Sequence, residues 1–96
     1  MAQNFYVYIM TNQRKTVLYT GVTNNLSKRV EQHKKKVVKG FTKRYNLDRL
    51  VYFEILDGGY SAIAREKQIK AFSRQKKFEM INKMNQNWND LSEQLW

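Results

Sequence analysis

Hydrophobic residues concentrate in three short runs that favour β-strands. The first two, NFYVYIM at residues 4–10 and TVLYTG at residues 16–21, are rich in aromatic and β-branched side chains. Because only the short polar segment TNQRK joins them, they are expected to pair as an antiparallel hairpin. The third run, LVYFEIL at residues 50–56, ends at the chain-breaking sequence DGG. The polar, basic segment 39–49 that precedes it is expected to be a loop.

Three further segments carry hydrophobic residues at intervals of three and four positions, the spacing of an α-helix. Asn24 or Asn25 can cap the first helix by accepting a hydrogen bond from a free backbone N–H. Ser61 is a candidate cap for a second helix that runs to about Ala71, and Ser73 is a candidate cap for a third. The spaced positions are Leu26, Val30, His33 and Val37, then Ala62, Ile63, Ile69 and Phe72, then Phe78, Ile81 and Met84.

The predicted order β-β-α-β-α-α indicates a small α/β domain of the α+β type, with a mainly antiparallel three-stranded sheet flanked by helices. We expect residues 1–96 to form a single domain, because the 96 residues contain no proline, no repeat and no low-complexity linker. The core is expected to span about residues 4–84. The tail, residues 85–96, is expected to pack on that core, because Trp88 and Trp96 each bury a large apolar area.

The composition excludes several kinds of protein. The chain has no cysteine, which rules out disulfides and thiolate metal sites. No apolar run approaches the length of a membrane span, and the N-terminal sequence MAQNFYVYIM lacks the basic start and long apolar stretch of a signal peptide. We therefore expect a soluble, cytoplasmic protein without a membrane partner.

The positive charge of the chain is the strongest indication of what the protein binds. The chain has 18 Lys and Arg against 8 Asp and Glu, a formal net charge of +10. Residues 28–44 hold eight Lys or Arg with one acid, and residues 65–77 hold six with one acid. If these segments converge on one face, they form a nucleic-acid-binding surface; the alternatives are a solvated surface, a membrane surface or an acidic protein partner. The candidate nucleic-acid-binding residues are Lys28, Lys34, Lys35, Lys36, Lys43, Arg44, Lys67 and Lys70.

Few acidic residues are available to hold a metal, and Glu66 stands out because it lies among Arg65, Lys67 and Lys70. Hydrolysis of a phosphodiester needs an activated water, stabilisation of charge on the phosphate and usually a divalent metal. Mg²⁺ is often held by only one or two carboxylates, with water and substrate oxygens completing its shell. The alternative is that Glu66 only pairs with Lys70, four positions later on a helix.

Arg29 and His33 also lie four positions apart, so a helix places them on one face. The planar guanidinium of Arg29 suits phosphate better than an ammonium does, and His33 can donate to phosphate or relay a proton. Tyr8 and Tyr19, on the two hairpin strands, can act on a water only where positive charge or a metal favours the phenolate. The alternatives are an exposed charge for Arg29, a half-buried helix residue for His33 and core packing for the tyrosines.

Taken together, these residues resemble the GIY-YIG nuclease superfamily over nearly the whole chain. The two motifs that name the family are matched by YVY at residues 6–8 and YTG at residues 19–21. The family's functional arginine and the histidine one turn later are matched by RVEQH at residues 29–33, and its metal-binding glutamate by Glu66. The resemblance is closest to a small, single-domain bacterial branch with YTG in place of YIG and an MNxxWxDL element, here residues 84–91.

The resemblance implies hydrolysis of phosphodiester bonds in DNA with one Mg²⁺ or Mn²⁺ ion. It implies that Glu66 holds the metal, Arg29 stabilises the phosphate charge and His33 assists proton transfer or contacts phosphate. One of the two tyrosines, Tyr8 or Tyr19, would activate or position the water.

Two structural roles also follow from the resemblance. Gly21 would let the backbone pass close to the site, where a side chain would crowd it. The family's late asparagine is assigned to Asn85, although Asn82, Asn87 and Asn89 lie in the same region. The leading glycine of the first motif is replaced by Tyr6, and the middle isoleucine of the second by Thr20; neither change removes a chemical group that the family uses.

Two other functions remain open from the sequence. The same fold with the same charge can serve as a non-catalytic nucleic-acid-binding module, or the protein can meet an acidic protein partner. We expect nucleic acid as the partner, with DNA favoured over RNA and with possible selectivity for DNA structure. Because one small domain offers little surface for choosing a substrate, a protein partner or a homodimer is expected to help with targeting.

Overall fold

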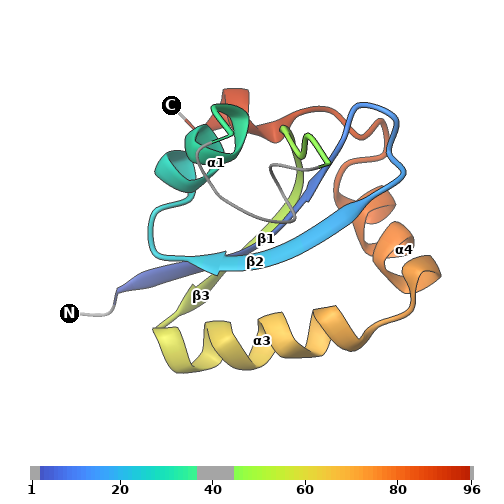
Figure 1. Ribbon diagram of the computed structural model, residues 1–96. Helices are drawn as coiled ribbons and strands as arrows, with labels where there is room; N and C mark the ends of the chain where they lie inside the picture. The colour runs from blue at the N-terminus through green and yellow to red at the C-terminus, as the bar shows by residue number, and fades with distance from the viewer. Residues whose placement is uncertain (1–2, 37–44, 96) are drawn as a thin grey trace.

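The computed structural model describes residues 3–36 and 45–95, and its centre is an open sheet of three antiparallel strands (Figure 1). The strands are β1 (Asn4–Thr11), β2 (Leu18–Thr23) and β3 (Arg49–Asp57), in the order β2-β1-β3. The helices are α1 (Leu26–Lys34), α3 (Gly59–Ala71), α4 (Arg74–Met84) and the short 3₁₀-helix η1 (Leu91–Gln94). The predicted α+β class and the order β-β-α-β-α-α are confirmed.

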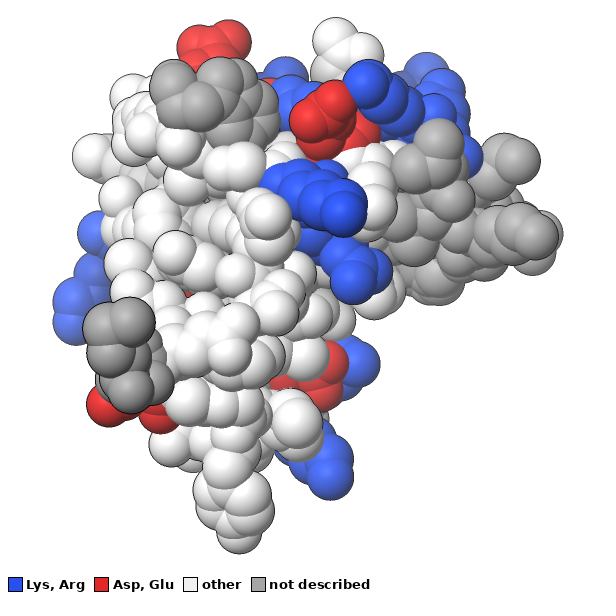
Figure 2. All heavy atoms as spheres, turned by 90° about the vertical axis from the view of Figure 1, so that its left-hand side faces the viewer, with Lys and Arg blue, Asp and Glu red and all other residues white. Residues whose placement is uncertain are grey.

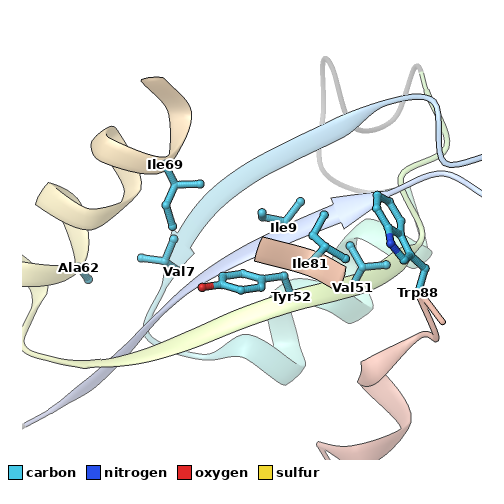
Figure 3. Packing of buried hydrophobic residues seen from close by; sticks show 8 residues of the cluster. All are labelled: Val7, Ile9, Val51, Tyr52, Ala62, Ile69, Ile81 and Trp88. Carbon is cyan, nitrogen blue, oxygen red and sulfur yellow. The ribbon is translucent and has the colours of Figure 1, made fainter. Parts of the chain in front are cut away.

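Alternation along the central strand gives the sheet two buried faces. Val7 and Ile9 point to the face that α3 and α4 cover, while Tyr8 and Met10 point to the face that α1 and η1 cover (Figure 1). Figure 3 shows the first face. The residues buried there are Val7, Ile9, Val51, Tyr52, Ala62, Ile69, Ile81 and Trp88. On the second face they are Tyr8, Met10, Leu26, Val30, Leu47, Leu50 and Leu91.

Strand β2 begins two residues later than the hydrophobic run predicts. The side-chain oxygen of Asn12 accepts hydrogen bonds from the backbone N–H groups of Thr16 (2.9 Å) and Val17 (3.3 Å). These two residues therefore belong to the turn, and the strand runs from Leu18 to Thr23. Because the strand continues to Thr23, Gly21 lies inside it and not at its end.

The helix starts follow two of the three predicted caps. Asn25 accepts a hydrogen bond from the backbone N–H of Lys28, and Ser73 accepts one from that of Lys76, both at 3.1 Å. The prediction that Ser61 caps the second helix is wrong, because α3 begins at Gly59. Gly58 has φ +90°, a conformation that glycine reaches without strain, and it turns the chain from β3 directly into the helix.

The C-terminal segment folds back on the sheet through Asn85 and Trp88. Val51 has no partner on β1, because the register shifts between Ile9 and Met10. The amide of Asn85 donates to the carbonyl of Val51 (3.1 Å) and to that of Asn89 (2.8 Å), so it supplies a partner at this bulge. Trp88 is 6% exposed, as predicted. Val37, Trp96 and most of the predicted 39–49 loop lie outside the described residues.

No helix in the described part of the chain has the length and apolar character needed to cross a membrane.

Candidate active site

Tyr8 lies directly opposite Gly21 in the ladder between β1 and β2. Tyr8 is 1% exposed, and its ring lies against the glycine. A Cβ atom at position 21 would lie 2.5 Å from the Tyr8 hydroxyl oxygen and 2.6 Å from Cζ, which is closer than real contacts allow. Because glycine leaves this space open, the Tyr8 ring can cross from β1 over the edge strand β2.

His33 of α1 meets this tyrosine from above the same face of the sheet. Its Nε2 lies 3.1 Å from the Tyr8 hydroxyl oxygen, and its side chain is 2% exposed. Tyr19 of β2 completes a group of three rings, with centroids 5.6 Å from His33 and 6.3 Å from Tyr8. The histidine and the two tyrosines predicted from the sequence are therefore in mutual contact.

Burial keeps Tyr8 and His33 uncharged. It lowers the pKa of His33 to about 4, and the nearby charge of Arg29 lowers this pKa further. Burial also raises the pKa of Tyr8 well above its usual range; Tyr19 and Glu66 add to this rise, and Arg29 opposes it. The Nδ1 atom of His33 is buried and has no hydrogen-bond partner among the described residues. This site therefore contains one polar atom with unused hydrogen-bonding capacity.

Arg29 and Glu66 place opposite charges near the Tyr8 hydroxyl. Their charges act on the pKa of Tyr8 in opposite directions, which shows that both lie within electrostatic range of it. Arg29 is half-buried and lies one turn before His33 on α1. The Glu66 side chain, on α3, is 15% exposed and pairs with Lys70 at 3.3 Å. The ion pair with Lys70, which was the alternative interpretation of Glu66, is thus present.

The rotation of α3 about its axis explains how Glu66 comes to lie at this edge of the sheet. Ala62 and Ile69 are fully buried against the sheet (Figure 3). Arg65 lies on one side of the line that joins them and contacts Glu54 of β3. Because successive helix residues point about 100° apart, Glu66 lies on the other side of this line, toward β2.

The contacts of Arg65 are not predicted by the sequence pattern. Its guanidinium binds Glu54 with Nε–Oε1 and Nη2–Oε2 distances of 2.9 and 2.8 Å, and the hydroxyl of Tyr52 donates to the same carboxylate. Burial favours the neutral acid, but the hydrogen bonds from Arg65 and Tyr52 hold the pKa of Glu54 below its usual value. The available signal was Glu54 itself, the one charge in LVYFEIL.

The described residues contain no group of three His, Cys, Asp or Glu side chains that could form a complete metal site. Glu66 fits a different kind of site, in which one carboxylate holds a hard cation and water or substrate oxygens fill the remaining positions. Its carboxylate is mostly buried and lies in electrostatic range of Tyr8. The donor chemistry therefore suits Mg²⁺ or Mn²⁺.

The predicted nucleic-acid-binding lysines divide into paired and open positions. Lys34 pairs with Asp90, Lys35 pairs with Glu31 at 2.6 Å, and Lys70 pairs with Glu66. Lys28, Lys36 and Lys67 are exposed, and Lys43 and Arg44 lie outside the described residues. On the face shown in Figure 2, Lys and Arg gather toward the upper right beside acidic side chains, and much of the remaining surface is uncharged.

Comparison with known proteins places the chain in a family. Residues 4–84 match the GIY-YIG catalytic domain. The chain belongs to the GIY-YIG family. A UPF0213 protein of Syntrophus aciditrophicus is 40% identical over 82 residues, which cover 84% of this chain and 92% of that protein. A UPF0213 protein of Clostridium perfringens is 38% identical over 77 residues, which cover 80% and 82%.

A solved structure shares the fold of this GIY-YIG domain. The solution NMR structure of a UPF0213 protein from Bacillus halodurans matches with a TM-score of 0.58 at 24% identity, over 94% of this chain and 95% of that chain. The predicted resemblance is thereby confirmed for both the family and the small bacterial branch. GIY-YIG domains are generally those of nucleases, so the family indicates a nucleic acid as substrate.

Proposed function

We propose that this protein is a divalent-metal-dependent endonuclease that hydrolyses phosphodiester bonds in DNA. The observation that supports this most is the contact between Tyr8 and His33 over Gly21, with Arg29 and Glu66 in electrostatic range. A buried pair of uncharged proton-carrying groups beside one cation and one carboxylate has the chemical parts that phosphodiester hydrolysis needs.

Each side chain then has one task. Tyr8 positions the attacking water, and the hydrogen bond to neutral His33 gives the proton a path away from the Tyr8 hydroxyl. Arg29 stabilises the charge that builds on the phosphate, and Tyr19 packs against both rings and keeps their geometry.

Glu66 would hold Mg²⁺ or Mn²⁺ after its carboxylate leaves Lys70, whose ammonium is then available to the phosphate backbone. The bound ion would supply a Lewis acid for a phosphate oxygen. The predicted lysines along α1 and α3, together with Lys43 and Arg44, would hold the backbone on either side.

A second candidate function is supported by one observation. Glu66 already has a cationic partner in Lys70, and the raised pKa of Tyr8 keeps its proton firmly in place. A protein that only binds nucleic acid through its basic surface would keep both features. We therefore retain a non-catalytic DNA-binding module as the alternative.

The test is nicking of a supercoiled plasmid with Mg²⁺ or Mn²⁺, beside EDTA and the variant Glu66→Gln. The matched control is Glu31→Gln, which removes a carboxylate that also pairs with a lysine four residues later, on an exposed surface. We expect metal-dependent nicking that is lost in Glu66→Gln and kept in Glu31→Gln, with both variants folded and still binding DNA. Binding without nicking in both metals, on branched and single-stranded DNA as well, would support the binding module. Nicking of RNA but not of DNA would overturn the choice of substrate.

A further inference from the structure

Helix α4 carries a second concentration of positive charge that the candidate active site does not use. Its eleven residues, Arg74–Met84, contain four cations and one acid, a net charge of +3 (4 − 1). The cations are Arg74, Lys76, Lys77 and Lys83, and the acid is Glu79. None of them is among the lysines predicted to hold nucleic acid at the site.

This helix lies on the opposite face of the sheet from α1. Ile81 anchors α4 against Ile9, whereas Leu26 and Val30 anchor α1 on the face that holds Tyr8. Figure 1 shows the two helices at opposite corners of the molecule with the sheet between them. The described cations of α1 and those of α4 therefore lie on opposite sides of the sheet. We expect that a straight duplex lying along α1 does not reach α4, because the sheet lies between the two helices.

The α4 surface borders a groove that two of its lysines line. Lys76 and Lys83, both exposed, border a groove of about 530 Å³ between α4, α3 and β3, which is also lined by Tyr52, Arg65, Glu79, Met80 and Met84. The Lys76 ammonium lies 5.9 Å from the Phe72 ring centroid. By contrast, Arg74 is used within the fold, since it donates to the carbonyl of Thr16 at 2.6 Å and lies 5.0 Å from the Phe78 ring centroid. Lysines of this kind hold phosphate by charge, without reading sequence.

We propose that α4 binds a second segment of the same nucleic acid, so that the preferred substrate has two duplex arms that diverge from the cleavage point. This rests on the proposed function. Once one arm is bound at the site, the second arm is tethered and its effective concentration near α4 is high. A nucleic acid is favoured over an acidic protein because it supplies anions to both surfaces from one molecule.

The test compares binding of a four-way DNA junction with binding of a linear duplex that has the sequence of one arm. Fluorescence anisotropy is measured in the Glu66→Gln background, so that cleavage does not interfere. Replacing Lys76, Lys77 and Lys83 by Gln is expected to lower affinity for the junction about ten-fold and to leave the linear duplex within about two-fold. The slope of log K against log salt should fall by about 2.7 for the junction only, because three phosphate contacts are lost.

Two further variants show whether an effect is specific to α4. Replacing Lys28, Lys35 and Lys36 by Gln, the matched set beside α1, should weaken both DNAs. Glu79→Gln removes the one acid on α4 and should strengthen binding of the junction alone. Circular dichroism confirms that each variant is folded.

Three results would contradict the proposal, and each would do so for a different reason. If the α4 variant weakens both DNAs equally, the protein has one continuous binding surface and the proposal is wrong. If it changes neither, α4 does not bind nucleic acid, and an acidic protein becomes the better partner for it. If the Glu66→Gln parent and the unsubstituted protein bind neither DNA, the proposed function itself fails, and the proposal fails with it.

Discussion

Two tyrosines on neighbouring strands, Tyr8 of β1 and Tyr52 of β3, sit on opposite faces of the sheet in very different surroundings. The hydroxyl of Tyr8 meets neutral His33, whose Nδ1 is left without a partner in the described structure. The hydroxyl of Tyr52 donates to Glu54, whose carboxylate is also bound twice by Arg65. The Tyr8–His33 pair therefore keeps one atom that can still form a hydrogen bond, whereas the carboxylate of Glu54 is already bound by both Tyr52 and Arg65.

Under the proposed function, Tyr8 takes part in the reaction and Tyr52 contributes to stability. An unsatisfied buried polar atom costs the folded state about 1–3 kcal/mol, so its presence beside Tyr8 suggests a function that needs it. The ion pair of Glu54 and Arg65 instead ties α3 to β3 and fixes the rotation of the helix, which directs Glu66 toward β2. Because its side chains are 30% and 22% exposed, solvent reduces its contribution to stability.

The largest effect is expected from removing one hydroxyl from each tyrosine. Tyr8→Phe should lower the rate of plasmid nicking by about 10²–10⁴-fold, the usual contribution of a proton-transferring group. Tyr52→Phe should leave the rate within two-fold and lower the free energy of unfolding by about 1 kcal/mol, the value of a typical hydrogen bond. Nicking rates and urea denaturation measure the two quantities on the same samples. Equal loss of activity in both variants would show that the two faces do not have separate roles.

The next effect is a fall in stability between pH 7 and pH 4.5 that the Tyr8 side should show through His33. His33 has a pKa of about 4 when folded and 6.5 as its ordinary value. The unfolded chain therefore binds the proton more readily, and stability falls as pH drops from 6.5 toward 4. The full difference is about 3 kcal/mol, since each pKa unit corresponds to about 1.4 kcal/mol.

Urea denaturation between pH 7 and pH 4.5 measures this dependence, with His33→Gln as the control. The control should lose most of the slope in this range, because Gln has no proton to bind. Glu54 and Asp90, whose pKa values are held below their usual range, reduce stability mainly at lower pH in both proteins. An unchanged slope in His33→Gln would mean that another group is responsible.

The sequence predicted the elements better than it predicted their contacts. The strands could be predicted from local runs of hydrophobic residues. The caps Asn25 and Ser73 could be predicted because each bonds a backbone N–H only three residues later. The start of α3 was missed, since the conformation of Gly58 rather than a hydroxyl cap sets it. The start of β2 was missed because the side chain of Asn12 holds two later residues in the turn.

The candidate site shows the same limit. The family resemblance pointed to Tyr8 and His33, but only the folded structure reveals that they touch and that burial keeps both uncharged. The separation of the α1 cations from the α4 cations was also out of reach, because it depends on which side of the sheet each helix covers. The sequence pattern shows which side of a helix is apolar, but the side of the sheet on which that helix packs depends on the whole fold.

The smallest expected effect comes from adding one methyl group on the Tyr8 side. In Gly21→Ala the new Cβ would lie 2.5 Å from the Tyr8 hydroxyl oxygen, so the ring must move away from its place beside His33. Overpacking of this kind costs about 1–3 kcal/mol.

The matched control is Gly59→Ala, where the new Cβ would lie 3.3 Å from the Phe5 ring, and its cost should be at most about 1 kcal/mol. We expect Gly21→Ala to lose nicking in proportion to the displacement of Tyr8, while Gly59→Ala keeps it. A fully active Gly21→Ala would show that the ring need not lie over the glycine for catalysis, and the geometric basis of the proposed site would then be lost.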